Sequence, residues 1–226
     1  MSSECRNVDA SPAKHTAGVG SLLLIRHART VANEEGVLLG RSDSPLSTTG
    51  MEQVNVIENA LRDSRPNAVF SSTLGRARLT VSGWSGTSIA SALLDEIDFG
   101  LLEGSTVLQA ELAGHFLPDG VLAEEDWSRC WPEGESLHDV MERSARFVRD
   151  ELASNLSEGA RVVVVGHKIS IACLALTLLN VSRSHFASFV LGSGEALAID
   201  LSKSSWSRGP FDNVVTAFTK CGEADG

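Results

Sequence analysis

The chain contains 226 residues with a mass of 24.0 kDa, a size that fits one large α/β domain, and its 42% apolar and 21% charged residues exclude a disordered or fibrous protein. The 29 acidic residues outnumber the 19 basic ones and give a formal net charge of −10, which repels nucleic acid and anionic membrane surfaces. An anionic ligand therefore needs a local cluster of cationic side chains or backbone N–H groups.

The chain opens on a polar segment, a strand and a helix. Residues 1–20 are rich in Ser, Ala and Gly, so we expect a flexible N-terminal tail before a single domain over residues 21–220. Leu22–Ile25 is a short apolar run typical of a strand covered on both faces. After a polar loop, a helix is expected to start at Thr48 or Thr49 because apolar residues then recur at spacings of three and four.

The middle of the chain repeats this plan. Ala68–Phe70 predicts a second buried strand, followed by a helix over Leu74–Gly83. The clearest helix opens at Ser136, which forms a capping-box-like pair with Asp139. The segment Leu112–Glu133 before it is either a lid over a pocket or a surface excursion.

The last third begins with the most apolar pair of elements. Arg161–Val165 predicts a third buried strand, and Ser170–Leu179 predicts a deeply buried helix. Leu197–Leu201 and Val214–Phe218 are interpreted as closing strands around a turn that contains Gly209 and Pro210.

Alternating strands and helices predict an α/β fold, a three-layer α/β/α sandwich with a mostly parallel central sheet. Ligands of such sheets bind beyond the carboxyl ends of the strands. We therefore expect one site built from side chains that follow the three apolar strands: Arg26, His27, Arg76, His167 and Lys168.

Two histidines and two arginines at one sheet edge are typical of a phosphate site with a nucleophile. Arginine presents a planar fork that matches phosphate oxygens, and helix N-termini add N–H donors. An imidazole with a reference pKa of about 6.5 is largely neutral at cytoplasmic pH and can attack phosphorus. A second histidine that donates to the phosphate oxygens would stabilise the transition state.

The leaving alcohol also needs a proton, and the segment Leu94–Gly100 offers carboxyl groups near the expected site. We predict Glu96 as the general acid because apolar neighbours favour its neutral form. Asp95, Asp98 and Glu103 are alternatives in the same region, and spacing alone does not separate the four.

Several ordered motifs resemble the histidine phosphatase superfamily, in its phosphoglycerate mutase-like branch. The resemblance extends from about Leu22 to Leu201 and rests on the shared order of motifs that are each weak alone. The matching segments are Arg26-His27-Ala28-Arg29-Thr30 with Asn33, Arg41–Ser47 with Gly50, Ser71–Thr80, Leu94–Glu96 with Phe99-Gly100 and Glu103-Gly104, Gly134-Glu135-Ser136, and Val165-Gly166-His167.

The resemblance implies a phosphoglycerate mutase-like fold and a set of roles. Asn33 is also open to a simpler interpretation, in which it only caps its loop. The implied roles are His27 as the phosphorylated nucleophile, Glu96 as acid and base, and Arg26, Asn33, Arg76 and His167 around the phosphoryl group. No metal-ligand cluster or Walker-type loop appears in the sequence, so we expect no metal and no cofactor.

The sequence departs from the family pattern at two positions. Ala28 replaces the usual glycine after the nucleophile, which is tolerable if the local φ is negative. Lys168 replaces the glycine after the second histidine and adds a cation beside the expected pocket. Our hypothesis is that Lys168 binds substrate and favours one with a second anionic group.

These inferences predict a metal-independent phosphatase that hydrolyses a small-molecule phosphomonoester through a phosphohistidine on His27. The alternatives are a phosphoglycerate mutase, a protein phosphatase, and a non-catalytic phospho-ligand or protein-binding module on the same fold. The expected partner is a small phosphorylated metabolite, and we expect binding to neither nucleic acid nor membrane. The oligomer considered is a homodimer.

The cysteines and the short apolar runs bear on the compartment. No CxxC pair occurs, and no apolar run is long enough for a membrane span or a signal-peptide core, so we expect a soluble, cytoplasmic protein with free thiols. The four cysteines are Cys5, Cys130, Cys173 and Cys221.

Overall fold

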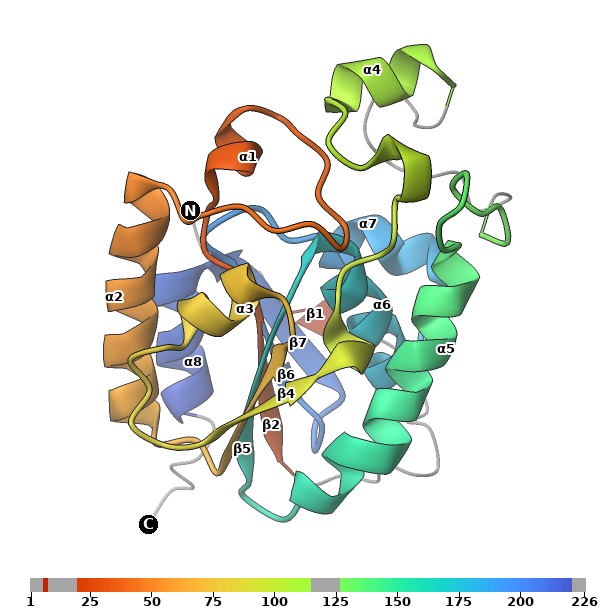
Figure 1. The fold of residues 1–226 in the computed structure, drawn as a ribbon. Coiled ribbons are helices and arrows are strands. Elements are labelled where there is room, and N and C mark those ends of the chain that lie inside the picture. Colours follow the sequence, from red (N-terminus) through yellow and green to blue (C-terminus); the bar gives the residue numbers. More distant parts are fainter. Residues whose placement is uncertain (1–5, 8–19, 115–126, 221–226) are drawn as a thin grey trace.

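The computed structural model describes residues 6–7, 20–114 and 127–220. The fold is built on a central sheet (Figure 1). Within these residues the sheet has seven strands in the order β1-β7-β6-β2-β5-β3-β4. The strands are β1 (Arg6–Asn7), β2 (Ser21–Arg26), β3 (Ala68–Ser72), β4 (Ser88–Ser91), β5 (Arg161–Gly166), β6 (Glu195–Asp200) and β7 (Ser205–Pro210). The three apolar runs thus form β2, β3 and β5, as predicted.

Four adjacent strands, β2, β5, β3 and β4, run parallel, while β6 is antiparallel to β2 and β7. The register sets Arg26 of β2 opposite Gly166 of β5. Consequently the residues that follow the two strands, His27 and His167, emerge at the same edge of the sheet.

Helices cover both faces of the sheet, which confirms the predicted α/β architecture (Figure 1). Leu22 and Leu24 of β2 belong to the apolar cluster that includes α5, α6 and α7, whereas Leu23 and Ile25 belong to the cluster that includes α2, α3 and α8. The helices are α1 (Val31–Glu34), α2 (Thr48–Ser64), α3 (Gly75–Thr80), α4 (Val107–Leu112), α5 (Leu137–Phe147), α6 (Lys168–Leu179), α7 (Phe186–Phe189) and α8 (Phe211–Lys220).

Helix starts follow the predicted caps closely. The Ser136 side chain accepts the Asp139 backbone N–H, and the Asp139 carboxylate accepts the Ser136 N–H in return, so the capping box is present at α5. Helix α2 begins at Thr48, where Ser47 caps it. Helix α6 begins at Lys168, two residues before the predicted Ser170, with the unusual N-cap His167.

One predicted strand is wrong. Val214–Phe218 lies in helix α8, and the last strand is β7, which contains Gly209 and Pro210 at its end. The apolar side chains of Phe211, Val214 and Phe218 are buried and recur at helical spacing against the sheet. A short apolar run such as this one does not distinguish strand from helix until Phe211, three positions before Val214, is included in the period.

Two predicted segments lie largely outside the described residues. Of the expected tail over residues 1–20, the described Arg6–Asn7 pairs with β7. Residues 115–126 of the predicted lid or surface excursion lie outside the description. Within the described ranges, no helix has the length and apolarity to cross a membrane.

Candidate active site

A pocket of about 360 Å³ opens at the carboxyl edge of the parallel strands, a volume suited to a small molecule. Six of the seven residues predicted for the site line it: Arg26, His27, Asn33, Arg76, Glu96 and Lys168. The seventh, His167, lies beside them, with its ring centroid 5.0 Å from that of His27. The structure therefore gathers every predicted site residue around one pocket.

His27 is held as a neutral ring with a defined tautomer. Its backbone N–H donates to Gly166 O at 2.9 Å, and its Nδ1 lies 2.8 Å from Ala28 O. A carbonyl oxygen only accepts, so Nδ1 carries the proton and Nε2 keeps its lone pair. The side chain is 4% exposed. Burial, together with the Arg26 and Arg76 guanidinium groups, lowers the pKa of His27 well below its usual value.

Ala28 meets the condition set for replacing the usual glycine. Its φ is not positive, unlike that of four other non-glycine residues in the described ranges, and its side chain is buried. Its backbone N–H donates to Thr80 Oγ1 at 2.9 Å. The extra methyl group is therefore accommodated without backbone strain.

His167 has the opposite tautomer. Arg76 Nε donates to its Nδ1 at 3.2 Å, so the ring proton is on Nε2, which lies 2.8 Å from Ser72 Oγ. Ser72 Oγ in turn donates to Asp95 Oδ1 at 2.7 Å. The ring is fully buried, and this burial, with the nearby His27 and Arg76, lowers the pKa of His167 well below its usual value. His167 is thus a neutral, rigidly oriented ring.

We expect NMR to show these two rings as opposite neutral tautomers. Imidazole ¹⁵N shifts should place the proton of His27 on Nδ1 and that of His167 on Nε2, because their fixed partners allow no other arrangement. Since both pKa values are lowered, neither ring should titrate between pH 6 and 8 in the folded protein, whereas both should titrate near about 6.5 in urea. A folded-state titration near that value would contradict the assignment.

Arg76 lies at the pocket, but its donors are bound to the protein. Its Nη1 donates to Ser42 O and Asp43 Oδ1, and its Nη2 donates to Gly40 O. A third carbonyl, Leu39 O, lies 3.4 Å from Nη2, and Nε bonds the His167 ring. In this structure Arg76 therefore fixes the loop over residues 39–43 and the second histidine.

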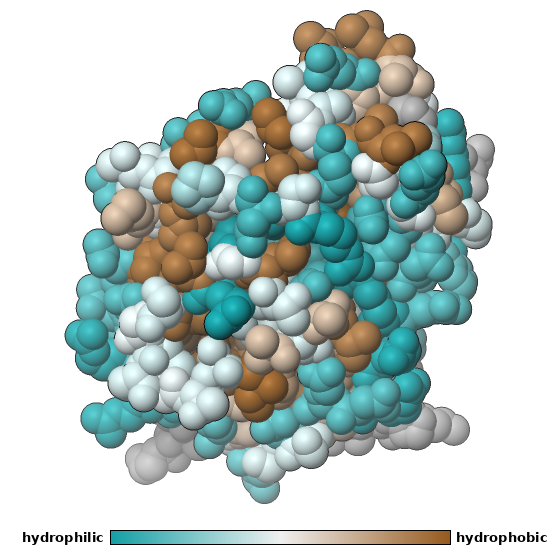
Figure 2. Space-filling model, in the orientation of Figure 1, coloured by the Kyte–Doolittle hydropathy of each residue, from teal (hydrophilic) through white to brown (hydrophobic). Residues whose placement is uncertain are grey.

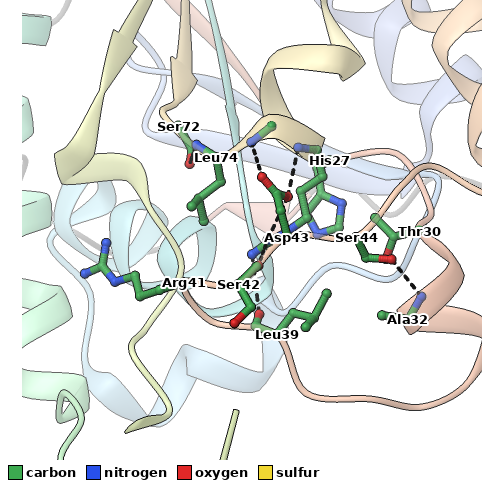
Figure 3. Close-up of polar contacts among 12 residues, drawn as sticks. His27, Thr30, Ala32, Leu39, Arg41, Ser42, Asp43, Ser44, Ser72 and Leu74 are labelled. Atoms are coloured by element: carbon green, nitrogen blue, oxygen red, sulfur yellow. Dashed lines mark hydrogen bonds and ion pairs between the residues drawn. The ribbon is translucent and has the colours of Figure 1, made fainter. Parts of the chain in front are cut away.

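Asp43 completes this loop. Its carboxylate accepts the backbone N–H groups of Gly75 and Arg76 at the start of α3 (Figure 3). Ser44 Oγ accepts the Ala32 N–H at 3.2 Å and ties the same loop to α1. These bonds fix the loop to α3 through Asp43 and to α1 through Ser44.

The structure separates the four candidate acids. Asp95 accepts from Ser72, Thr73 and Arg41; Asp98 accepts the Gly100 N–H; and Glu103 accepts the N–H groups of Gly40, Arg41 and Ser42. These three carboxylates hold loops together and do not line the pocket. Glu96 does line it.

Glu96 lies at the N-terminus of α6. Its Oε1 accepts the Ser170 N–H at 3.1 Å and its Oε2 accepts the Ile169 N–H at 3.2 Å, while its own neighbour Ile97 donates to Oε1. The residue is 5% exposed. Helix N–H groups therefore hold this carboxyl group at the pocket surface, within the enclosure that contains His27.

The remaining predicted residues occupy different parts of the wall. Arg26 Nη1 donates to Leu191 O at 3.0 Å, while its Nε is buried without a partner among the described residues. Asn33 Oδ1 accepts the Thr30 N–H, so this residue both caps α1 and lines the pocket. Lys168 is exposed at the rim, and partial desolvation and Arg26 lower its pKa.

Sequence reasoning missed a third arginine and the apolar wall. Arg29 lines the pocket, and the only sequence signal for it is its position two residues after His27. Opposite the charged floor, the pocket is lined by apolar side chains. These are Val37, Leu38, Leu39, Phe99, Val107, Ile169, Phe186 and Val190.

Helix α4 contributes to this wall at its first residue. Val107 lines the pocket, while Leu108 and Leu112 of the same helix are exposed, 64% and 80% respectively. Figure 2 shows apolar residues gathered on this part of the surface. In the described residues, no group of three or more His, Cys, Asp or Glu side chains has the arrangement of a metal site.

Comparisons with known proteins agree with the geometry. Residues 22–208 match a family model described as the histidine phosphatase superfamily, branch 1. A relative from Klebsiella pneumoniae, "Probable phosphoglycerate mutase GpmB", is 31% identical over 195 residues, which cover 81% of this chain and 86% of the relative.

Solved structures extend the similarity. A mycobacterial glucosyl-3-phosphoglycerate phosphatase in complex with VO3 is 26% identical, with a TM-score of 0.67 over 79% of this chain and 92% of that one. A phosphoserine phosphatase from Entamoeba histolytica in complex with 3-phosphoglyceric acid is 25% identical, with a TM-score of 0.63 over 80% and 90% of the two chains. The chain is therefore similar over most of its length to proteins named as mutases and as phosphatases.

Proposed function

The chain belongs to branch 1 of the histidine phosphatase superfamily, and on that premise we propose that it hydrolyses a small-molecule phosphomonoester through a phosphohistidine on His27, without a metal ion. One observation carries the proposal: His27 is neutral, its Nδ1 is fixed on Ala28 O, and its Nε2 is left to react in a pocket that also contains Arg26 and Glu96.

The first chemical step breaks the ester. His27 Nε2 forms a bond to phosphorus while the bond from phosphorus to the ester oxygen breaks, and Glu96 supplies the proton that the departing alcohol needs. Arg26, whose Nε has no protein partner in the described part of the chain, binds the phosphoryl oxygens. Arg76 and Ser72 act as positioning residues for His167.

The second step regenerates the site. A water molecule attacks the phosphohistidine, its proton passes to Glu96, and inorganic phosphate leaves as the bond to His27 Nε2 breaks. His27 then returns to its Nδ1-protonated form, and Glu96 is again ready to donate. Four cations line the pocket, so the charge of the dianionic phosphoryl group is stabilised by side chains: Arg26, Arg29, Arg76 and Lys168.

A phosphoglycerate mutase is the second candidate, because the Klebsiella pneumoniae relative carries that name. A mutase would return the phosphoryl group to a second hydroxyl of a sugar acid, so it needs polar groups around the substrate. The described outer wall is instead mostly apolar. This wall supports hydrolysis, in which the alcohol is released after its phosphate is removed and does not have to be held for a second transfer.

A screen of phosphorylated metabolites tests the proposal. We expect release of inorganic phosphate, an acid-labile phosphate on His27 detected by mass spectrometry after a rapid quench, and no interconversion of 2- and 3-phosphoglycerate. Interconversion without phosphate release would establish the mutase. If neither turnover nor labelling of His27 occurs with any phosphoester, the non-catalytic binding module would replace the proposed function.

A further inference from the structure

The hydroxyl group of Ser72 has all of its hydrogen-bonding positions occupied. It donates to Asp95 Oδ1 at 2.7 Å and accepts the Leu74 N–H at 3.1 Å. His167 Nε2 lies 2.8 Å from the same oxygen, and both side chains are fully buried. A serine hydroxyl offers one proton and two lone pairs. Because its proton is on Asp95, this hydroxyl can only accept from the His167 ring.

The other nitrogen of the His167 ring connects to the pocket. Arg76 Nε donates to Nδ1 at 3.2 Å, and Arg76 lines the pocket that contains His27. Since the imidazole ring is rigid, the bond at Nε2 fixes where the lone pair of Nδ1 points. The hydrogen bonds therefore run without a break from Asp95, through Ser72 and the ring, to the pocket wall.

The Asp95 carboxylate is held rigidly at the start of this chain of bonds. The residue is 5% exposed, and its carboxylate accepts the backbone N–H and the hydroxyl of Thr73, each at 2.8 Å. Arg41 Nη1 lies 3.1 Å from Asp95 Oδ2, and Arg41 Nη2 lies 3.1 Å from Glu135 Oε1. These donors fix the carboxylate in the orientation that accepts the Ser72 proton.

Asp95 does not line the pocket, so any effect that it has on the reaction passes through other residues. A role confined to its loop would need only the bonds to Thr73 and Arg41. The bond from Ser72 adds a further effect, because a hydroxyl that lost this acceptor could rotate and donate elsewhere. His167 Nε2–H would then lose its acceptor in a fully buried position, where an unsatisfied donor is costly.

We propose that Asp95 is a positioning residue that fixes the orientation of His167 through Ser72. By taking the hydroxyl proton, Asp95 keeps Ser72 an acceptor for the Nε2–H of the ring and keeps the Nδ1 lone pair directed at Arg76. This inference rests on the proposed function and adds to it a residue outside the pocket lining. It predicts that Asp95 affects the reaction only while residue 72 carries a hydroxyl group.

A double-mutant cycle tests the path through Ser72. The kcat for p-nitrophenyl phosphate hydrolysis is measured in wild type, Ser72→Ala, Asp95→Ala and the double variant. Each single substitution is expected to reduce kcat by about 10- to 100-fold, the scale of a misplaced group in an active site. The double variant should lose no more than about threefold beyond Ser72→Ala, because no hydroxyl is left to orient. Losses that multiply in the double variant would overturn the inference.

The His167 Nε2–H signal in ¹H–¹⁵N spectra gives a readout that a role confined to the loop would not move. In Asp95→Ala we expect this proton to shift upfield and to exchange faster with solvent, because Ser72 no longer accepts from it in every molecule. Asp95→Asn retains a carbonyl oxygen for the Ser72 proton, so it should keep the wild-type signal and most of kcat. An unchanged signal in Asp95→Ala would overturn the inference.

Asp98→Ala is the matched control, because Asp98 lies in the same segment, accepts the Gly100 N–H and does not contact His167. We expect it to leave the Nε2–H signal as in wild type. Should Asp95→Ala fail to fold, Asp95→Leu fills the space without an acceptor and carries the same expectations. Absence of p-nitrophenyl phosphate hydrolysis in wild type would count against the proposed function, whereas the Nε2–H signal would still decide whether Asp95 orients the ring.

Discussion

Removing the His27 imidazole is expected to reduce phosphate release by about 10⁴-fold or more, the scale at which loss of a nucleophile is felt. In His27→Ala no other described side chain is in place to form the phosphorus bond, because both ring nitrogens of His167 are engaged by Arg76 and Ser72. The measurement is steady-state phosphate release on the best substrate of the screen, together with quench-flow detection of phosphoprotein.

A second variant guards against a folding defect. In His27→Asn the side-chain N–H₂ lies where Nδ1 lies in histidine, so it can still donate to Ala28 O while the reactive nitrogen is gone. We expect this variant to match wild-type thermal unfolding closely and to be as inactive as His27→Ala. His138→Ala, at a half-buried position on α5, is the matched histidine control. Substantial turnover in the well-folded asparagine variant would remove His27 from the proposed role.

The second large effect is expected at Glu96 and depends on the leaving group. An alkoxide leaves only with a proton, whereas p-nitrophenolate needs little protonation. Glu96→Gln should therefore slow hydrolysis of an alkyl phosphate by about 10²- to 10⁴-fold and that of p-nitrophenyl phosphate by much less. The readout is kcat/KM for both substrates in wild type and variant. Equal losses on the two substrates would assign the proton to another group.

Glu103→Gln is the matched control for this experiment. Like Glu96, Glu103 accepts several backbone N–H groups, but it lies outside the pocket lining. Both glutamine variants lose part of their acceptor capacity, so each is expected to lose about 1–3 kcal/mol of stability. Only the Glu96 variant should discriminate between leaving groups, which separates a chemical role from a structural one.

The placement of the site could be predicted from the sequence because it depends on strand ends. Apolar runs mark β2, β3 and β5, and parallel strands bring the residues after them to one edge. Capping signals work similarly, since Ser136 and Asp139 act within one turn of their own helix. Local chemistry and simple topology are sufficient for these features.

Features that depend on distant partners could not be predicted. The sequence predicted Glu96 from its apolar neighbours, but excluding Asp95, Asp98 and Glu103 required knowing which carboxylates bind the loops. The binding of Arg76 to the loop over residues 39–43 joins segments more than thirty positions apart. Helix α8 was mistaken for a strand because Val214–Phe218 is too short to reveal its period. The place of Arg29 in the pocket lining was not predicted, because its position depends on hydrogen bonds of its backbone to Gln53 of α2 and to Ser47 before α2.

The spacing of neighbouring strands in the sheet sets the distance between the two histidines. The His27 amide donates to Gly166 O in continuation of the β2–β5 ladder, and the 5.0 Å between the rings is close to the spacing of neighbouring strands, about 4.8 Å. We expect amide protons at such a position to exchange only when the whole domain unfolds, and those of the wall over α1 and α4 to exchange by local opening. Substitutions in this part of the pocket wall are therefore not expected to disturb the spacing of the two histidines.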